Sequence, residues 1–308
     1  MSKNLSNVVL VDANSFVYKS FYGYNPMVDV TTKDDYKVLT GLMQSLYDIV
    51  KNVDNIEFLF FVFDACDSAL YRRCIYPAYK ENRPPTPMEL TQQRNFAKSI
   101  LQTQIGIPII EYPGFEADDA IASLASYYKK NHNVIVVSPD KDLFQLIDEK
   151  TMLLRPYKKD NQKVFEYISS KGVEKYFGVK AHQIPDYLAL VGDTCDNLPG
   201  IDKIGKKTAS YLLNKYSSIE EMFVIIEDIK QLDKEYLKVL TYLQENIDFI
   251  KMVKHLATVK SDLEISQDVQ KSLEIARSIQ ETPAYFARVE NLAVNYNWKP
   301  HFIEFLRA

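Results

Sequence analysis

The sequence predicts a doubly wound α/β fold, with a mostly parallel sheet first and a largely helical region after it. Short apolar runs at residues 8–11, 58–63 and 134–137 are rich in β-branched or aromatic residues, as strands buried on both faces are. Between the first two lies a segment of helical periodicity, residues 39–50. Strands alternating with helices in this way build sheets whose ligands bind beyond the carboxyl ends of the strands.

The composition is that of an ordinary globular protein. The chain has 308 residues, of which 46% are hydrophobic and 25% charged, enough for one large domain or two smaller ones. Its three cysteines form no CxxC pair and its four histidines are scattered, so neither a disulfide framework nor a zinc site is expected. We find no leader-like segment and no apolar run of membrane-spanning length, and expect a soluble protein in a reducing compartment.

Each of the three apolar runs leads into aspartate. Asp12 ends the first run, Asp64 ends the second, and Asp140 and Asp142 follow the third. Because the carboxyl ends of parallel strands meet at one edge of a sheet, we expect these side chains to lie close together. A single aspartate after a strand is usually a turn residue or a helix cap. Three at equivalent strand ends indicate an acidic site.

The densest acidic motif lies at residues 114–121. Glu116, Asp118 and Asp119 fall between an apolar run at 107–112 and a segment of helical periodicity, which places them in the first turn of a helix. Glu116 and Asp119 are three apart, so they share a face and can converge on a cation. Hard oxygen ligands favour Mg²⁺ or Mn²⁺. Standing alone, such a cluster is more often a solvated helix start.

Residues 66–105 form a segment of different composition, with basic and aromatic residues and prolines at 77, 84, 85 and 87. The prolines predict a loop or broken helix. Inserted between two acid-bearing elements, this segment is expected to overhang the acids. Arg72, Lys80 and Arg83 would then contact phosphates, while Tyr76 or Tyr79 stack on bases. The alternative is a solvated basic loop.

After a predicted hairpin through residues 158–161 the chain turns mostly helical, and one segment there is informative. Asp193 and Asp196, three apart near a helix end, can add carboxylates to the acidic site. A glycine-bounded hairpin then leads into a helix whose open N-terminus suits a phosphate, as a duplex backbone would supply. The residues of this feature are Gly200, Gly205, Lys206, Lys207 and Thr208. A merely capped helix start is the alternative, and the spacing is not that of a Walker A loop.

Together these motifs resemble the 5′ nuclease family, which includes the N-terminal 5′-3′ exonuclease domain of bacterial DNA polymerase I, bacteriophage relatives and flap endonucleases. The resemblance covers nearly the whole chain. It is carried by the motifs at 10–12, 62–64, 79–85, 116–119, 140–142, 192–200, 256–260 and 295–298. Since no polymerase follows, the resemblance implies a stand-alone form.

The resemblance implies a PIN-like nuclease domain at 1–180, with a basic arch at about 66–105, and a helical duplex-binding domain at 181–308 that carries a helix-three-turn-helix hairpin. It implies a phosphodiesterase using two Mg²⁺ or Mn²⁺ ions, with a K⁺ ion at the hairpin. The implied metal ligands are Asp12, Asp64, Glu116, Asp118, Asp119, Asp140, Asp142, Asp193 and Asp196. Lys80 and Arg83, with Asp118, would be catalytic. The implied DNA contacts are Lys19, Arg72, Tyr79, Lys80, Arg83, Gly200, Gly205, Lys206, Lys207 and Thr208.

The implied activity is structure-dependent cleavage of DNA, as a 5′-3′ exonuclease and 5′ flap endonuclease that leaves a 5′-phosphate. The substrate would be a flap or 5′ end at a single-strand/duplex junction. We expect a cytoplasmic, nucleoid-associated monomer, or one in a host's cytoplasm if phage-encoded, that works with a separate DNA polymerase. The formal net charge of −4 does not exclude nucleic acid, because without the nine site acids the remainder would carry +5.

Two positions depart from the family pattern. Lys19 stands where polymerase-linked members carry arginine, and Asp202 and Lys203 replace the usual hairpin turn, so the K⁺ site is open. The alternatives are a non-cutting junction-binding protein, for which loss of acids would be the sign, and a single-strand ribonuclease of the PIN-like class. An aspartyl phosphatase is disfavoured by the spacing after Asp64 and Asp140. Lys251, Lys254 and Lys260 fit a solvated helix face better than phosphate contacts.

Overall fold

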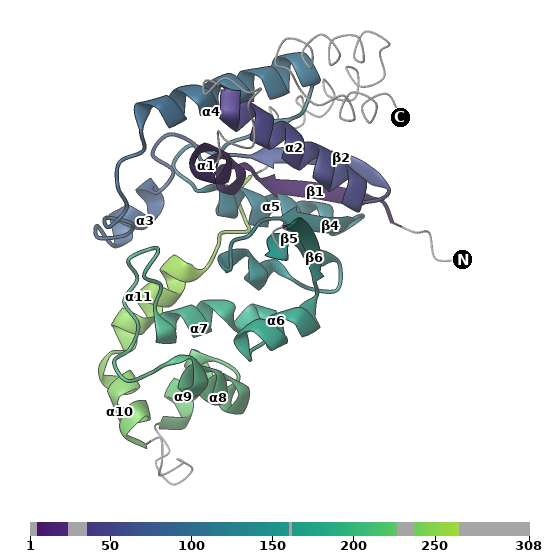
Figure 1. The fold of residues 1–308 in the computed structure, drawn as a ribbon. Helices are drawn as coiled ribbons and strands as arrows, with labels where there is room; N and C mark the ends of the chain where they lie inside the picture. The colour runs from purple at the N-terminus through teal and green to yellow at the C-terminus, as the bar shows by residue number, and fades with distance from the viewer. Residues whose placement is uncertain (1–4, 24–35, 160–161, 227–236, 265–308) are drawn as a thin grey trace.

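The computed structural model describes residues 5–23, 36–159, 162–226 and 237–264 (Figure 1). A six-stranded sheet runs in the order β3-β2-β1-β4-β5-β6, and every neighbouring pair is parallel except β5 and β6. The strands are β1 (Asn7–Asp12), β2 (Ile56–Val62), β3 (Ile109–Ile110), β4 (Asn133–Val137), β5 (Thr151–Lys159) and β6 (Gln162–Ile168). The predicted mostly parallel, doubly wound sheet is therefore confirmed.

Helices cover both faces of the sheet and form most of the second half of the chain. They are α1 (Ala13–Gly23), α2 (Lys37–Asn52), α3 (Leu70–Ile75), α4 (Met88–Ile100), α5 (Ala117–Tyr128), α6 (Ser170–Phe177), α7 (Ile184–Val191), α8 (Lys206–Tyr216), α9 (Ile219–Ile226), α10 (Leu237–Glu245) and α11 (Ile247–Ala257). Shorter turns are the π-helical η2 (Leu101–Ile105) and the 3₁₀ turns η3 (Asp142–Leu146) and η4 (Ala181–Gln183). Figure 1 shows α1, α2 and α4 on one face, α5 on the other, and α7–α11 gathered beyond one side of the sheet.

The alternation of side chains along the strands creates two cores. On β1, Val8 and Leu10 pack into the core that contains α5 and α7, while Val9 and Val11 pack into the core under α1, α2 and α4. All four are fully buried. A strand buried on both faces needs apolar residues at every position, which explains why these strands read as continuous apolar runs.

The predicted basic segment is a broken helix, as its prolines indicate. Helix α3 ends at Ile75, just before Pro77, and α4 begins at Met88, directly after Pro87. Proline lacks the N–H that a helix interior needs, so the chain between the two helices is irregular. The predicted hairpin is also found, since β5 and β6 pair antiparallel up to Lys159 and Gln162. Its tip at 160–161 lies outside the described residues.

A close approach of two glycines shapes the loop after α7. Gly192 has φ +83°, and a Cβ there would lie 2.4 Å from the Gly200 nitrogen. A Cβ on Gly200 would lie 2.3 Å from the carbonyl oxygen of Val191. The turn that carries the next two acids therefore requires glycine at both positions. Among the described helices, none is both long enough and apolar enough to cross a lipid bilayer.

Candidate active site at the carboxyl edge of the sheet

The strand-end aspartates meet at one edge, as predicted. Asp12 is the last residue of β1, and β1 lies between β2, which leads to Asp64, and β4, which leads to Asp140 and Asp142. Because the three neighbouring strands are parallel and in register, their carboxyl ends deliver these acids to the same edge.

Serines hold the central aspartate. The Asp12 carboxylate accepts hydrogen bonds from Ser15 Oγ at 2.5 Å and from Ser138 Oγ at 2.7 Å. Ser138 Oγ also accepts the backbone N–H of Asp140 at 2.9 Å. One serine thus fixes the relative placement of two acids. Ser138 was missed by the sequence analysis, although its position directly after β4 was a usable signal.

The motif at 116–119 begins α5, as predicted. Glu116 is the N-cap and forms a capping box with Asp119, while the N–H of Ala117 bonds Asp64 Oδ1 at 2.8 Å. This bond joins the α5 N-terminus to the end of β2. Burial, the Asp140 charge and the Asp12 charge together raise the pKa of Asp118 well above its usual range.

Burial also raises the pKa of Asp64 to about 6, with the charge of Glu116 adding to the effect. Asp142 has its pKa raised to about 7 by burial and by the neighbouring Asp140 charge. Carboxyl groups in this state resist ionisation unless cations lie among them. The electrostatics of the site therefore favour the binding of cations.

A second group of acids joins the helical region to the sheet. One carboxylate oxygen from each of Asp142, Asp193 and Asp196 lies within 4.8 Å of the others. Lys141 forms ion pairs with Asp193 and, at 3.2 Å, with Asp142. Lys141 lies between two predicted ligands, Asp140 and Asp142, and this position was a usable signal that did not lead to a prediction.

The predicted arch cations reach this edge. Lys80 Nζ forms an ion pair with Glu116 and lies 3.5 Å from Asp196, while Arg83 Nη2 lies 2.7 Å from Asp196. Burial on its own would raise the pKa of Asp196, but Lys80, the Tyr79 hydroxyl and Arg83 together lower it. Lys80 is mostly buried, whereas about half of the Arg83 side chain is exposed.

Two of the predicted site residues, Arg72 and Asp119, pair with each other inside the protein. Arg72, predicted to contact phosphates, is 3% exposed and forks onto Asp119 with N–O distances of 2.6 and 2.8 Å. Asp119, predicted as a metal ligand, is fully buried and also accepts the N–H groups of Glu116 and Lys260. With four donors on its two oxygens, this carboxylate has no lone pair left for an ion.

Tyr79 is a third predicted site residue that lies inside the protein. It was expected to stack on bases, but only 2% of it is exposed and its hydroxyl lies 2.8 Å from both Glu116 Oε2 and Asp196 Oδ2. Burial and these two carboxylates raise the pKa of the phenol. Tyr79 therefore links an acid of α5 to an acid of the loop after α7.

The hairpin after α7 places the predicted basic helix start at the surface. Gly205 is the N-cap of α8, Lys206 and Lys207 are exposed in its first turn, and Thr208 is half-buried. In the turn before it, Lys203 takes the left-handed φ of +65°, where glycine is the usual residue. The altered hairpin thus keeps a left-handed turn residue.

Helix α1 carries two neighbouring exposed side chains, Tyr18 and Lys19, and the first of them contacts the arch. Lys19, a predicted DNA contact, is exposed, as is the adjacent Tyr18. The Tyr18 hydroxyl lies 3.1 Å from Thr86 Oγ1 in the proline-rich segment. Among the helical lysines, Lys254 pairs with Asp186 at 2.6 Å and is part of the protein's own packing.

A family model described as the 5′-3′ exonuclease N-terminal resolvase-like domain matches residues 7–178, and one described as the 5′-3′ exonuclease C-terminal SAM fold matches residues 179–281. The chain belongs to the 5′-3′ exonuclease family. A 5′-3′ exonuclease of Aquifex aeolicus is 35% identical over 292 residues, covering 92% of this chain and 97% of that protein. The family predicted from the sequence motifs is thereby confirmed.

A DNA polymerase I sequence and two solved structures are also similar to this chain. A DNA polymerase I of Caldicellulosiruptor bescii is 32% identical over 84% of this chain, which matches 29% of that polymerase. Bacteriophage T5 5′-exonuclease with zinc shares the fold with a TM-score of 0.63 at 19% identity, covering 88% of this chain and 99% of that one. Human GEN1 with Holliday junction DNA gives a TM-score of 0.60 at 14% identity, covering 98% and 71%.

Proposed function

We propose that this 5′-3′ exonuclease-family protein is a structure-dependent nuclease that cuts DNA phosphodiesters at 5′ flaps and 5′ ends and leaves a 5′-phosphate. The observation that carries the proposal is the acidic edge, where burial and mutual repulsion raise the pKa of Asp64, Asp118 and Asp142. Such carboxylates fit divalent cations better than any uncharged ligand.

The donor set fits two hard ions. The acids that would hold Mg²⁺ or Mn²⁺, directly or through water, are Asp12, Asp64, Glu116, Asp118, Asp140, Asp142, Asp193 and Asp196. Asp119 is left out because its oxygens are already occupied. When bound, such ions lower the pKa of water and neutralise charge on a phosphate. A T5 flap endonuclease bound to DNA and metal ions shares the fold with a TM-score of 0.65 at 18% identity, which supports this assignment.

The chain's own cations complete the chemistry. Lys80 and Arg83 stand over Glu116 and Asp196, at the edge where a scissile phosphate would lie. Their charge would oppose the negative charge that develops on the phosphoryl oxygens. Arg83 is the more exposed of the two, so it suits first contact with DNA, while the buried Lys80 suits the reacting phosphate.

We assign duplex binding to the start of α8. Lys206 and Lys207 offer charge, and the first-turn N–H groups next to Gly205 offer donors to a phosphate without reading sequence. Lys19 on α1, Gly200 in the hairpin and Thr208 in α8 complete the proposed contacts, and a K⁺ ion at the hairpin belongs to the same proposal.

The division into a nuclease domain at 1–180 and a duplex-binding domain at 181–308 is likewise part of this proposal. We place the protein as a monomer in the cytoplasm near the nucleoid, or in a host's cytoplasm if phage-encoded. The match to DNA polymerase I relatives supports work alongside a separate polymerase.

Cleavage of a 5′-labelled flap duplex in Mg²⁺ tests the proposal. Wild type should release the flap, Asp118→Asn should abolish release, and Lys80→Ala should slow it by about 10². Lys51→Ala, which removes an exposed lysine at the end of α2, should cut like wild type.

A wild-type protein that binds the junction but releases nothing in Mg²⁺ or Mn²⁺ would overturn cleavage in favour of a non-cutting junction-binding protein. Faster cutting of single-stranded RNA than of the flap would favour the ribonuclease alternative.

A further inference from the structure

The last two residues of α11 and the non-helical chain that follows them lie against the acid-bearing elements; we call this segment, residues 256–263, the strap. In Figure 1 it runs from the end of α11 towards the sheet. Its backbone bonds side chains more than 100 residues away in sequence. Ser123 Oγ accepts the Leu263 N–H at 3.1 Å, and its single O–H is shared between the Asp119 carbonyl at 2.8 Å and the Lys260 carbonyl at 3.2 Å. Arg72 Nε donates to the Leu256 carbonyl at 2.9 Å.

Gln145 holds the centre of the strap. Its Oε1 accepts the Val259 N–H at 3.0 Å, and its Nε2 donates to the Ala257 carbonyl at 3.1 Å. The same Nε2 donates to the carbonyl of Asp142 at 2.8 Å. One amide therefore ties the strap to the backbone of a residue whose carboxylate belongs to the acidic edge.

Asp119 provides a second link of the same kind. It accepts the Lys260 N–H at 2.8 Å while belonging to the α5 capping box with Glu116. The strap therefore touches both the first turn of α5, which carries Glu116 and Asp118, and η3, which carries Asp142. These elements lie in different parts of the sequence, and the strap bridges them.

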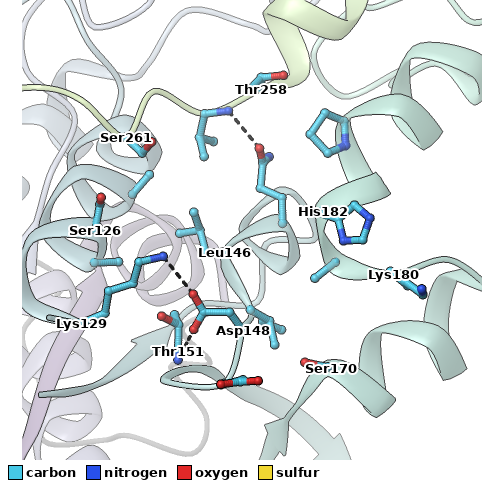
Figure 2. Close-up of a pocket in the computed structure, with 18 of the residues that line it drawn as sticks. Ser126, Lys129, Leu146, Asp148, Thr151, Ser170, Lys180, His182, Thr258 and Ser261 are labelled. Atoms are coloured by element: carbon cyan, nitrogen blue, oxygen red, sulfur yellow. Dashed lines mark hydrogen bonds and ion pairs between the residues drawn. The ribbon is translucent and has the colours of Figure 1, made fainter. Parts of the chain in front are cut away.

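Packing holds the strap only in part, because a cavity lies beside it. The cavity is about 620 Å³ and is lined by strap residues, by α5, α6 and η4, and by η3 with the turn after it, including Gln145. Figure 2 shows Thr258 and Ser261 at one side of it, with His182 and Ser170 across from them. Because this side is not close-packed, the hydrogen bonds to the strap from Gln145, which itself lines the cavity, help to decide where the strap lies.

We propose that the strap is a brace that sets the spacing of the acids, and that Gln145 is a positioning residue for the divalent ions. The inference rests on the proposed metal-dependent function. Gln145 touches neither ion nor DNA in this scheme. It fixes the backbone at Asp142 relative to α5, and partners of ligating groups commonly tune metal affinity in this way.

The chain offers a matched control in Gln183. This glutamine also makes three backbone hydrogen bonds, accepting the Lys180 N–H at 2.9 Å and donating to the carbonyls of Leu213 and Ser217 at 2.9 and 2.8 Å. It lies in η4, among helices of the second half. Gln145→Met and Gln183→Met each remove three comparable bonds with little change of volume, so both should lower the thermal midpoint.

The experiment measures Mn²⁺ binding to the full-length chain by electron paramagnetic resonance, alongside thermal melting and flap cleavage. We expect Gln145→Met to weaken Mn²⁺ binding about tenfold while Gln183→Met binds like wild type. Ser123→Ala, a milder change in the strap's contacts, should weaken binding in the same direction, and it decides the matter if Gln145→Met does not fold.

Equal Mn²⁺ affinity in Gln145→Met, Ser123→Ala and wild type would overturn the brace, whatever happens to the melting temperature. Equal weakening in Gln183→Met would also overturn it, because the effect would then follow general destabilisation. A wild type that neither binds Mn²⁺ nor cuts the flap would instead remove the proposed function, so the two failures are distinguishable.

Discussion

Asp118 and Asp119 are neighbours in sequence, yet substituting each with asparagine should change stability in opposite directions. Asp119 is fully buried and holds the Arg72 fork at 2.6 and 2.8 Å. An asparagine there cannot accept both Arg72 donors, and the buried guanidinium loses its bidentate countercharge and keeps only Glu116 Oε2 at 3.1 Å. Breaking a buried pair by removing one partner costs about 3–5 kcal/mol. At ~2–4 °C per kcal/mol, the thermal midpoint should fall by about 10 °C.

The change in stability expected for Asp118→Asn has the opposite sign, because the charge of Asp118 is unfavourable in the metal-free protein. Burial and the charges of Asp140 and Asp12 raise its pKa, so a neutral asparagine removes repulsion. In EDTA at pH 7.5 we expect Asp118→Asn to melt at or above the wild-type temperature. Circular dichroism melts of the three proteins in the same buffer make the comparison. An Asp119→Asn protein as stable as Asp118→Asn would refute the assignment of Asp119 to the ion pair.

Three further outcomes are expected. In EDTA the protein should become more stable as the pH falls from 8 to 5. The pKa values of Asp64 (about 6) and Asp142 (about 7) exceed the unfolded value of 3.8, so the folded state binds more protons than the unfolded state in this range. Thermal melts should show this trend, and Mg²⁺ should reduce the dependence of the thermal midpoint on pH. Gly192→Ala should cost about 2 kcal/mol or more in urea unfolding, because a Cβ would lie 2.4 Å from the Gly200 nitrogen, whereas Gly205→Ala, with nothing within 4 Å, should be nearly neutral. Replacing Lys206 and Lys207 by alanine should reduce the salt slope of duplex binding by about 2, measured by fluorescence anisotropy in Ca²⁺, while Lys171→Ala, an exposed lysine of α6, leaves it unchanged.

The parts of the fold that follow from local rules were predictable. Continuous apolar runs give strands buried on both faces, and the prolines at 77 and 87 bracket the gap between α3 and α4. The strand order could not be derived in this way. β5 adds parallel to β4 and β6 turns back antiparallel, a choice made by packing that no single segment encodes.

Burial is the property of the site residues that the sequence motifs did not show. Arg72, Tyr79 and Asp119 were assigned by residue type, and each has the chemistry expected of a phosphate contact, a stacking ring or a ligand. All three are buried in this structure: Arg72 and Asp119 pair with each other, and the Tyr79 hydroxyl contacts Glu116 and Asp196. A sequence motif shows which groups meet but not which of them face solvent, because that depends on the strap and arch that cover them.

The acidic edge depends on both halves of the chain. A boundary near residue 180 would assign Asp193 and Asp196 to the helical half, yet Asp196 pairs with Arg83 at 2.7 Å and lies beside Tyr79. Backbone contacts add to this, since Asn82 Nδ2 donates to the Thr194 carbonyl at 2.7 Å. The loop after α7 and the arch are therefore packed as one unit. The strap adds a second connection between the two halves, because it bonds Asp119 of α5 and Gln145 of η3. The helical half both contributes acids and carries the proposed duplex contacts. A movement of that half on binding DNA would therefore change the positions of Asp193 and Asp196 relative to the other acids.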